Sequence, residues 1–122
     1  MRALAVCQDE LVIRTLHRVL SGTFEIEFMV ESRPLARRLV DDGVSATVSD
    51  PKRVDSYVRA DLTPTTCVIV EDSGKRHLKK IATAIRDAGG SLLYIIGVAL
   101  QSEAKTYENA FRRVRQSLQI AD

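Results

Sequence analysis

Short apolar runs alternate along the chain with longer stretches that are apolar at every third or fourth position. The runs cover residues 3–7, 25–30, 44–49, 67–71 and 92–98. Most of them are rich in Val, Ile, Leu or Phe, and runs of this length between polar turns predict buried β-strands. The second run alternates, so Met29 is expected to share the wetter face of its strand with Glu25 and Glu27.

The intervening stretches have the period of amphipathic helices, about 3.6 residues. Their apolar stripes are Val12, Leu16, Val19 and Leu20, then Leu78, Ile81, Ala82 and Ile85, and finally Tyr107, Ala110, Phe111, Val114 and Leu118. Ser32 before Pro34 marks a helix start, while Gly43 and the pair Gly89–Gly90 mark helix ends. The last helix is expected at about residues 102–118.

This alternation predicts an α/β fold, a doubly wound parallel sheet with helices on both faces. The chain contains no linker or repeat, so residues 1–122 are expected to form one domain. Such sheets bind ligands beyond the carboxyl ends of their strands, where the strand order reverses. The candidate cofactor-binding residues at these ends are Cys7, Gln8, Asp9, Glu31, Ser32, Asp50 and Glu71.

The amino-acid composition disfavours several classes of function. The chain is 45% hydrophobic and 28% charged, as in globular proteins. Lys and Arg total 18 against 16 Asp and Glu, an excess too small to favour nucleic-acid binding. The longest apolar run, residues 92–100, is about half of what a bilayer requires, so no membrane insertion is expected.

The chain start and the cysteines indicate the compartment. Polar residues follow the first run too soon for a signal peptide, so a cytoplasmic location is expected. Cys7 ends one predicted strand and Cys67 begins its neighbour, which places them too far apart for a disulfide. Two free thiols are therefore expected.

The turn after the first strand is where dinucleotide-binding domains carry three glycines, which let the pyrophosphate approach the backbone. Cys7, Asp9 and Val12 occupy those positions here. Their Cβ atoms crowd the phosphate path, and Asp9 and Glu10 add negative charge where a helix start would otherwise attract an anion. Ordinary NAD binding is therefore disfavoured, and Asp9 can alternatively be the cap of the first helix.

Acids recur at the other strand ends. Glu31 has the position of an acid that binds an adenosine ribose, or it is a solvated strand end. Asp50 either contacts a ligand or caps a helix that starts near Pro51. The predicted acidic rim, which suits a cation better than a naked phosphate, comprises Asp9, Glu10, Glu31, Asp50, Glu71 and Asp72.

Basic side chains gather opposite the apolar stripes, as solvated faces or as a docking surface for an acidic partner. They are Lys75, Arg76, Lys79, Lys80, Arg112, Arg113 and Arg115. His17 and His77 lack the spacing of zinc ligands. No hydrolase, zinc-protease or P-loop motif occurs and no nucleophile is set up, so we expect no enzyme.

Four stretches of the sequence share a pattern of residues with a known protein family. They are Val30, Glu31, Ser32, Leu39, Asp42 and Gly43, then Val48, Ser49 and Asp50, then Val54, Tyr57, Ala60 and Leu62, and residues 67–70. Over about residues 1–98 this resembles the TrkA-N family, the nucleotide-binding lobe of RCK domains that regulate potassium channels and transporters. The resemblance implies a Rossmann-like five-stranded sheet of order 3-2-1-4-5 in which Glu31 would bind ribose. The phosphate glycines are missing, and Ser49 replaces the glycine that ends the third strand.

The resemblance implies two alternatives. A degenerate lobe would be a non-catalytic regulatory or assembly module without a cofactor, whereas a lobe with a retained site would sense NAD, ATP or AMP. Its partner would be a membrane transporter, or a phosphoesterase, because similar lobes head DHH-type exopolyphosphatase-related proteins. This chain has no Asp-His-His triplet. A homodimer is also expected, because the apolar fifth strand would lie at a sheet edge that needs cover.

A third alternative is a receiver-like phospho-acceptor domain. The chain resembles response-regulator receivers in Asp9 and Glu10 after the first strand and Asp50 after the third, where receivers hold Mg²⁺ and take a phosphoryl group. The lysine that receivers carry after the fifth strand is missing, since residues 97–101 are Gly-Val-Ala-Leu-Gln.

Overall fold

The structure is a computed structural model, and it describes residues 2–72, 78–90 and 92–97. The helix expected at about residues 102–118 lies outside these residues, as does the last residue of the expected fifth strand. Within them, strands and helices alternate as the hydrophobic pattern predicts.

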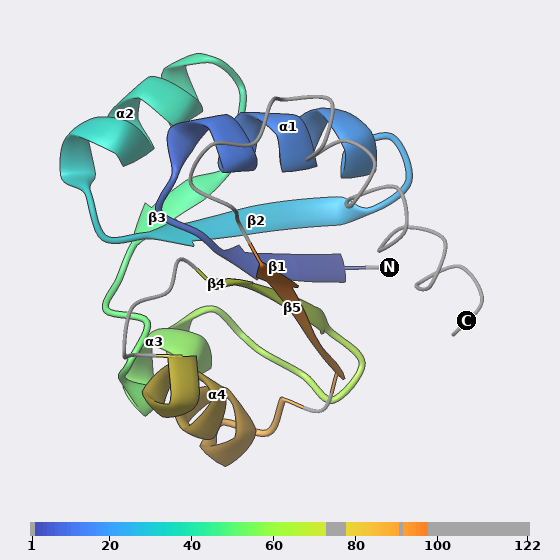
Figure 1. The fold of residues 1–122 in the computed structure, drawn as a ribbon, viewed down its shortest axis with the longest axis vertical. Coiled ribbons are helices and arrows are strands. Elements are labelled where there is room, and N and C mark those ends of the chain that lie inside the picture. The colour runs from blue at the N-terminus through green and yellow to red at the C-terminus, as the bar shows by residue number, and fades with distance from the viewer. Residues whose placement is uncertain (1, 73–77, 91, 98–122) are drawn as a thin grey trace.

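The sheet has five parallel strands in the order β3-β2-β1-β4-β5 (Figure 1). They are β1 (Arg2–Val6), β2 (Glu25–Val30), β3 (Ala46–Val48), β4 (Cys67–Asp72) and β5 (Leu92–Gly97). The predicted order is confirmed. β5 lies at one edge as expected, and the homodimer that would cover it stays a prediction.

Helices cover both faces of the sheet (Figure 1). α1 (Glu10–Leu20) and α2 (Arg33–Asp41) lie on one face, and α3 (Val54–Arg59) and α4 (Leu78–Asp87) on the other. Each face has its own buried cluster, and successive residues of β2 alternate between them: Phe28 belongs to the first cluster and Met29 to the second. Met29 lies on the face opposite Phe28, as predicted, but it is fully buried, so the expectation that this face is wetter is wrong at Met29. α3 and α4 cover that position.

Three helices end in one hydrogen-bonded motif. After α2, the Val44 N–H donates to the Leu39 carbonyl and Gly43 takes a φ of 83°. After α4, Gly89 takes the same place with a φ of 96°. After α3, Asp61 stands there with a φ of 59°, a left-handed conformation that the other two helices give to glycine. The predicted glycine stops of α2 and α4 are confirmed.

The motif after α2 explains why β3 is shorter than predicted, with residues 46–48 in place of 44–49. The backbone N–H of Val44 completes the end of α2, and its side chain is buried beneath that helix rather than in the strand. The Ser45 carbonyl accepts the Phe28 N–H just before β3 begins. The other strand boundaries differ from prediction by one residue at most where they are described.

None of the helices in the described part of the chain is both long enough and apolar enough to span a bilayer.

Candidate functional site

The strand order reverses between β1 and β4, the position at which doubly wound sheets bind their ligands. β1 leads into α1 on one face, whereas β4 precedes α4 on the other (Figure 1). Val6 pairs with Val70, so Cys7 and Glu71 follow next in the register at the carboxyl edge. We call residues 7–9 the β1–α1 turn.

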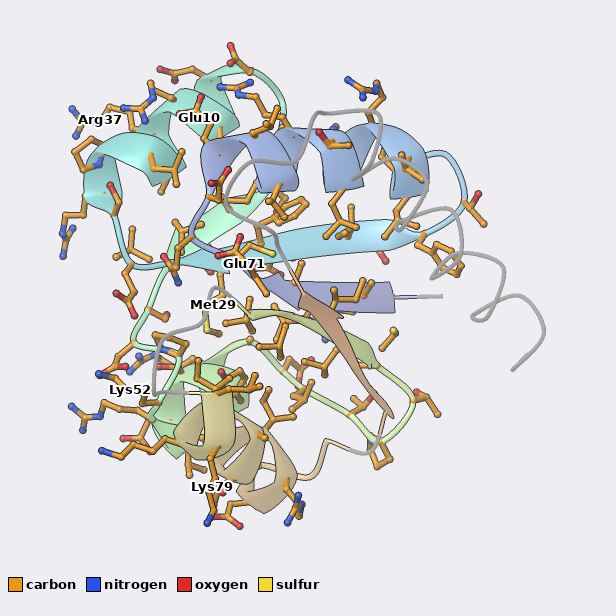
Figure 2. All side chains as sticks on the ribbon, viewed as in Figure 1. Glu10, Met29, Arg37, Lys52, Glu71 and Lys79 are labelled. Atoms are coloured by element: carbon orange, nitrogen blue, oxygen red, sulfur yellow. The ribbon has the colours of Figure 1, made fainter. Side chains whose placement is uncertain are left out.

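The Glu71 carboxylate closes this turn. Its Oε2 accepts the Gln8 N–H at 3.3 Å and its Oε1 accepts the Asp9 N–H at 3.2 Å. Figure 2 shows Glu71 at the level of the sheet, between the two helical layers. A glycine-rich turn directs backbone donors of this kind at a pyrophosphate. In this structure a side chain of the protein itself supplies the anion.

Asp9 is the N-cap of α1. Its Oδ1 accepts the N–H of Leu11 at 2.9 Å and that of Val12 at 3.2 Å, and its carbonyl accepts the Ile13 N–H. These are donors of the first helical turn that would otherwise be available to an anion. The capping interpretation is confirmed, and the cap places a second carboxylate beside the first.

The turn between β2 and α2 carries one acid that engages no other described residue. Gln8 Oε1 accepts the Glu31 N–H at 2.9 Å, which joins the ends of β1 and β2. Ser32 Oγ accepts the Leu35 N–H at 3.2 Å as the N-cap of α2. The Glu31 side chain is exposed and makes no hydrogen bond or ion pair with any other described residue. Among the side chains of Gln8, Glu31 and Ser32, that of Glu31 is the one left for a ligand.

Both cysteines are buried free thiols, as predicted. Burial raises the pKa of the Cys7 thiol well above its usual value, and the negative charges of Glu71 and Asp9 raise it further. Burial also raises the pKa of Cys67 to about 12. Both thiols are therefore neutral near pH 7.

Asp50 stabilises the turn between β3 and α3. Its Oδ1 accepts the Lys52 N–H at 3.0 Å, and its carbonyl accepts the Ser56 hydroxyl at 2.6 Å. The expectation that Asp50 caps a helix near Pro51 is wrong, because α3 begins later, at Val54. The buried Tyr57 hydroxyl donates to the Pro51 carbonyl, which ties this turn to α3. Burial, and then the charge of Asp50, raise the pKa of Tyr57.

Most of the predicted acidic rim is engaged internally. Glu10 accepts from Arg14 at 2.9 Å and from Arg38 at 2.8 Å, and these bonds lower the pKa of the Glu10 carboxyl. Arg14 also pairs with Asp42 at 2.8 Å, so the network joins α1 to α2. In the described part of the chain no three His, Cys, Asp or Glu residues gather as metal ligands. The side chain of Asp72 lies outside the described residues.

The strand order also decides against the receiver alternative. Receivers have the order 2-1-3-4-5, with the third strand beside the first. Here β3 pairs with β2 at the outer edge, and β1 lies between β2 and β4. Asp9 is moreover engaged as a helix cap rather than turned toward Asp50 as a metal ligand.

Comparisons with known proteins support the fold. No protein-family model matches the sequence, and no curated protein matches it. Two structures of the Citrobacter sp. triphenylmethane reductase, one of them complexed with NADP(H), align with a TM-score of 0.55 and 19% identity. The alignments cover 96% and 95% of this chain, but only 46% and 45% of the reductase. The chain thus spans less than half of that enzyme, and the likeness shows a Rossmann-like fold alone.

A third structure is the NAD(P)-binding domain of an exopolyphosphatase-related protein from Archaeoglobus fulgidus. It aligns over 94% of this chain and 97% of its own, with 14% identity and a TM-score of 0.49.

A groove outside the turn was missed by the sequence reasoning. It has a volume of about 340 Å³ and lies where the start of α3 meets α4. Lys52, Lys79 and Lys80 line it together with Val54 and Ala84. The exposed basic face of α4 was a signal for it, but nothing local joins Lys52 to that face. We call it the lysine groove.

Proposed function

We propose that this protein is a non-catalytic regulatory or assembly module that keeps a Rossmann-like frame and has closed its dinucleotide site. The observation that carries the proposal is the pair of hydrogen bonds from the Gln8 and Asp9 N–H groups to Glu71. A module without a bound cofactor would act through the proteins that it contacts.

The energetics support closure. An entering pyrophosphate would have to displace Glu71 from two hydrogen bonds, each worth about 1 kcal/mol. It would then meet the carboxylate of Asp9, and two like charges about 4 Å apart repel by about 1–4 kcal/mol. With the Cβ atoms of Cys7 and Asp9 in the phosphate path, both charge and volume oppose binding.

The proposal includes the TrkA-N type. It is supported by the strand order and by the sequence pattern of β2, α2 and α3, including the helix end at which Asp61 takes a glycine-like conformation. A transporter or a phosphoesterase would then be the regulated partner, and a homodimer would cover β5. These partners are proposed from the resemblance.

Glu31 favours a second candidate, an adenine-nucleotide sensor. Its carboxylate is exposed at the end of β2, where a ribose hydroxyl would be bound. Such a sensor would need Glu71 to leave the turn when the nucleotide enters.

Calorimetric titration of the full chain with NADH, NADPH, ATP, ADP and AMP tests the proposal. We expect no saturable heat with the wild-type protein, and no rise in its melting temperature. Stoichiometric binding that Glu31→Gln weakens would favour the sensor instead. Stoichiometric binding that Glu31→Gln leaves unchanged would contradict both accounts.

A further inference from the structure

The charges of the lysine groove are not engaged within the described part of the chain. Three lysines and one aspartate, Asp87, line it, which gives the lining a net charge of +2. Lys52, Lys79 and Lys80 are exposed, and none of their side chains makes an ion pair or hydrogen bond with another described residue. A lining with this excess of positive charge attracts anionic groups of an occupant.

The floor of the groove is apolar. It includes Val54 from α3 and Ala84 from α4, and the Thr83 hydroxyl beside them is engaged with the Lys79 carbonyl at 2.9 Å. An occupant therefore meets methyl groups below and ammonium groups at the rim. A fully hydrated ion would leave those methyl groups uncovered.

The apolar surface continues beyond the groove along α3. Val58 lies one helical turn after Val54, on the same side of the helix, and is 62% exposed. A small anion within the groove would not reach it. An occupant long enough to cover both valines and the lysines is an extended or helical peptide segment.

The charges orient that segment. Lys79 and Lys80 lie in the first turn of α4 and Asp87 at its last residue. Asp87 comes seven positions after Lys80 in the helix, which is a rise of about 10 Å. Carboxylates of an occupant would therefore lie at the lysine end and be repelled from the Asp87 end.

We propose that the lysine groove and Val58 form a docking surface for an acidic amphipathic helix of a partner protein. Glutamates or aspartates of that helix pair with Lys52, Lys79 and Lys80, and its apolar side chains cover Val54 and Val58. This inference rests on the proposed function, because it names the class of protein through which the module would act. The nucleotide titration tests the turn and the experiment below tests the groove, so each can fail without the other.

The probe is a synthetic helical peptide of about 18 residues, end-blocked and fluorescently labelled. Two leucines one helical turn apart are flanked by glutamates on one face. One counterpart carries lysine for every glutamate, and another carries serine for both leucines. Fluorescence anisotropy with the full wild-type chain should show saturable binding of the acidic peptide alone, weakened about tenfold between about 50 mM and about 300 mM salt.

Variants on the two sides of the molecule separate the groove from general charge. Lys79→Glu combined with Lys80→Glu should weaken binding at least about tenfold. Arg37→Glu should change it less than about twofold, because Arg37 is exposed on α2, on the opposite side of the molecule (Figure 2). Val58→Ser should weaken binding about threefold to tenfold, whereas Val40→Ser, at a valine that is 55% exposed on α2, should not. Thermal melting confirms that each variant is folded.

A gain of affinity removes the ambiguity of any variant that fails to fold. Asp87→Lys extends the basic rim and should strengthen binding of the acidic peptide severalfold. Weaker or unchanged binding by this variant would count against the proposed orientation.

Several results would overturn the proposal. One is the absence of saturable binding, and another is an equal loss with Arg37→Glu and with the double lysine variant. Displacement of the peptide by an equimolar amount of pyrophosphate would identify a small anion as the occupant. Concentration-dependent dimerisation in sedimentation velocity, abolished by the double lysine variant and unchanged by Arg37→Glu, would identify a second copy of this chain.

Discussion

The β1–α1 turn and the lysine groove handle charge in opposite ways. In the turn, the carboxylates of Glu71 and Asp9 bind backbone N–H groups of the same turn and of the helix that follows it. In the groove, Lys52, Lys79 and Lys80 extend over an apolar floor without an ion pair to another described residue. The acids of the turn are engaged by the fold itself, whereas the lysines of the groove engage no other described residue.

The difference shows why counting charges is not enough to find a site. The acids at the strand ends outnumber the groove lysines, and they lie where doubly wound sheets bind ligands. Most of them nevertheless stabilise the fold. A charge is available to a partner only where no neighbour in the structure already satisfies it.

The largest effect is expected from Glu71→Ala. Removing the carboxylate leaves the Gln8 and Asp9 N–H groups without that acceptor and should lower the free energy of unfolding by about 2 kcal/mol. Glu31→Ala is the matched control on the same edge and should stay within about 0.5 kcal/mol of wild type. Urea denaturation measures both. Equal effects of the two variants would remove the distinction between an engaged and an unengaged acid.

The cap of α1 should contribute about half as much. Asp9→Ala removes the acceptor of the Leu11 and Val12 N–H groups and should cost about 1 kcal/mol in the same assay. Asp9→Asn keeps a capping oxygen and should recover most of that loss. If Asn is as destabilising as Ala, the charge of Asp9 rather than its cap is what matters.

The Glu10 network should respond to acid. Its bonds to Arg38 and Arg14 lower the pKa of the Glu10 carboxyl from 4.5, so the folded state binds this proton less readily than the unfolded chain. The network therefore stabilises the folded state at pH values above the pKa that Glu10 has in the unfolded chain. This stabilisation is lost as the pH falls through the lower pKa of Glu10 in the folded state. Glu10→Gln should melt below wild type at pH near 7, and the gap should close in strong acid. A gap that widens on acidification would contradict this sign.

The smallest effect on stability is expected in the groove. Lys79→Ala and Lys80→Ala remove charges that engage no described residue, and each should change the free energy of unfolding by less than about 0.5 kcal/mol. Lys79 contributes its carbonyl to Thr83, a main-chain contact that alanine preserves. Destabilisation comparable to that of Glu71→Ala would show that these lysines are structural.

Most of the fold could be predicted from local sequence patterns. The alternation at residues 25–30 predicted β2 to the residue, and Gly43 and Gly89 predicted two helix ends, because these features depend on near neighbours in the sequence. β3 was predicted too long because an apolar residue, Val44, belongs to the end of α2. The spacing of apolar residues does not show whether a buried residue belongs to a strand or to the end of a helix.

The candidate site could be predicted less completely, because it depends on contacts between residues that are far apart in the sequence. The sequence placed the candidate site residues correctly at the carboxyl ends of the strands. It also identified Asp9 as a helix cap, because a cap depends on adjacent residues. The bond from Glu71 to the β1–α1 turn requires the register of β1 against β4. The lysine groove likewise requires α3 to lie beside α4, which brings Lys52 close to residues far along the chain.

The central claim is that Glu71 already fills the anion position of the β1–α1 turn. Two-dimensional ¹H–¹⁵N spectra report on it directly through the amide resonances of Gln8 and Asp9. We predict that Glu71→Gln shifts both resonances, and that millimolar pyrophosphate leaves them unchanged in the wild-type protein. Saturable shifts of these two amides on adding pyrophosphate to wild type would contradict the account.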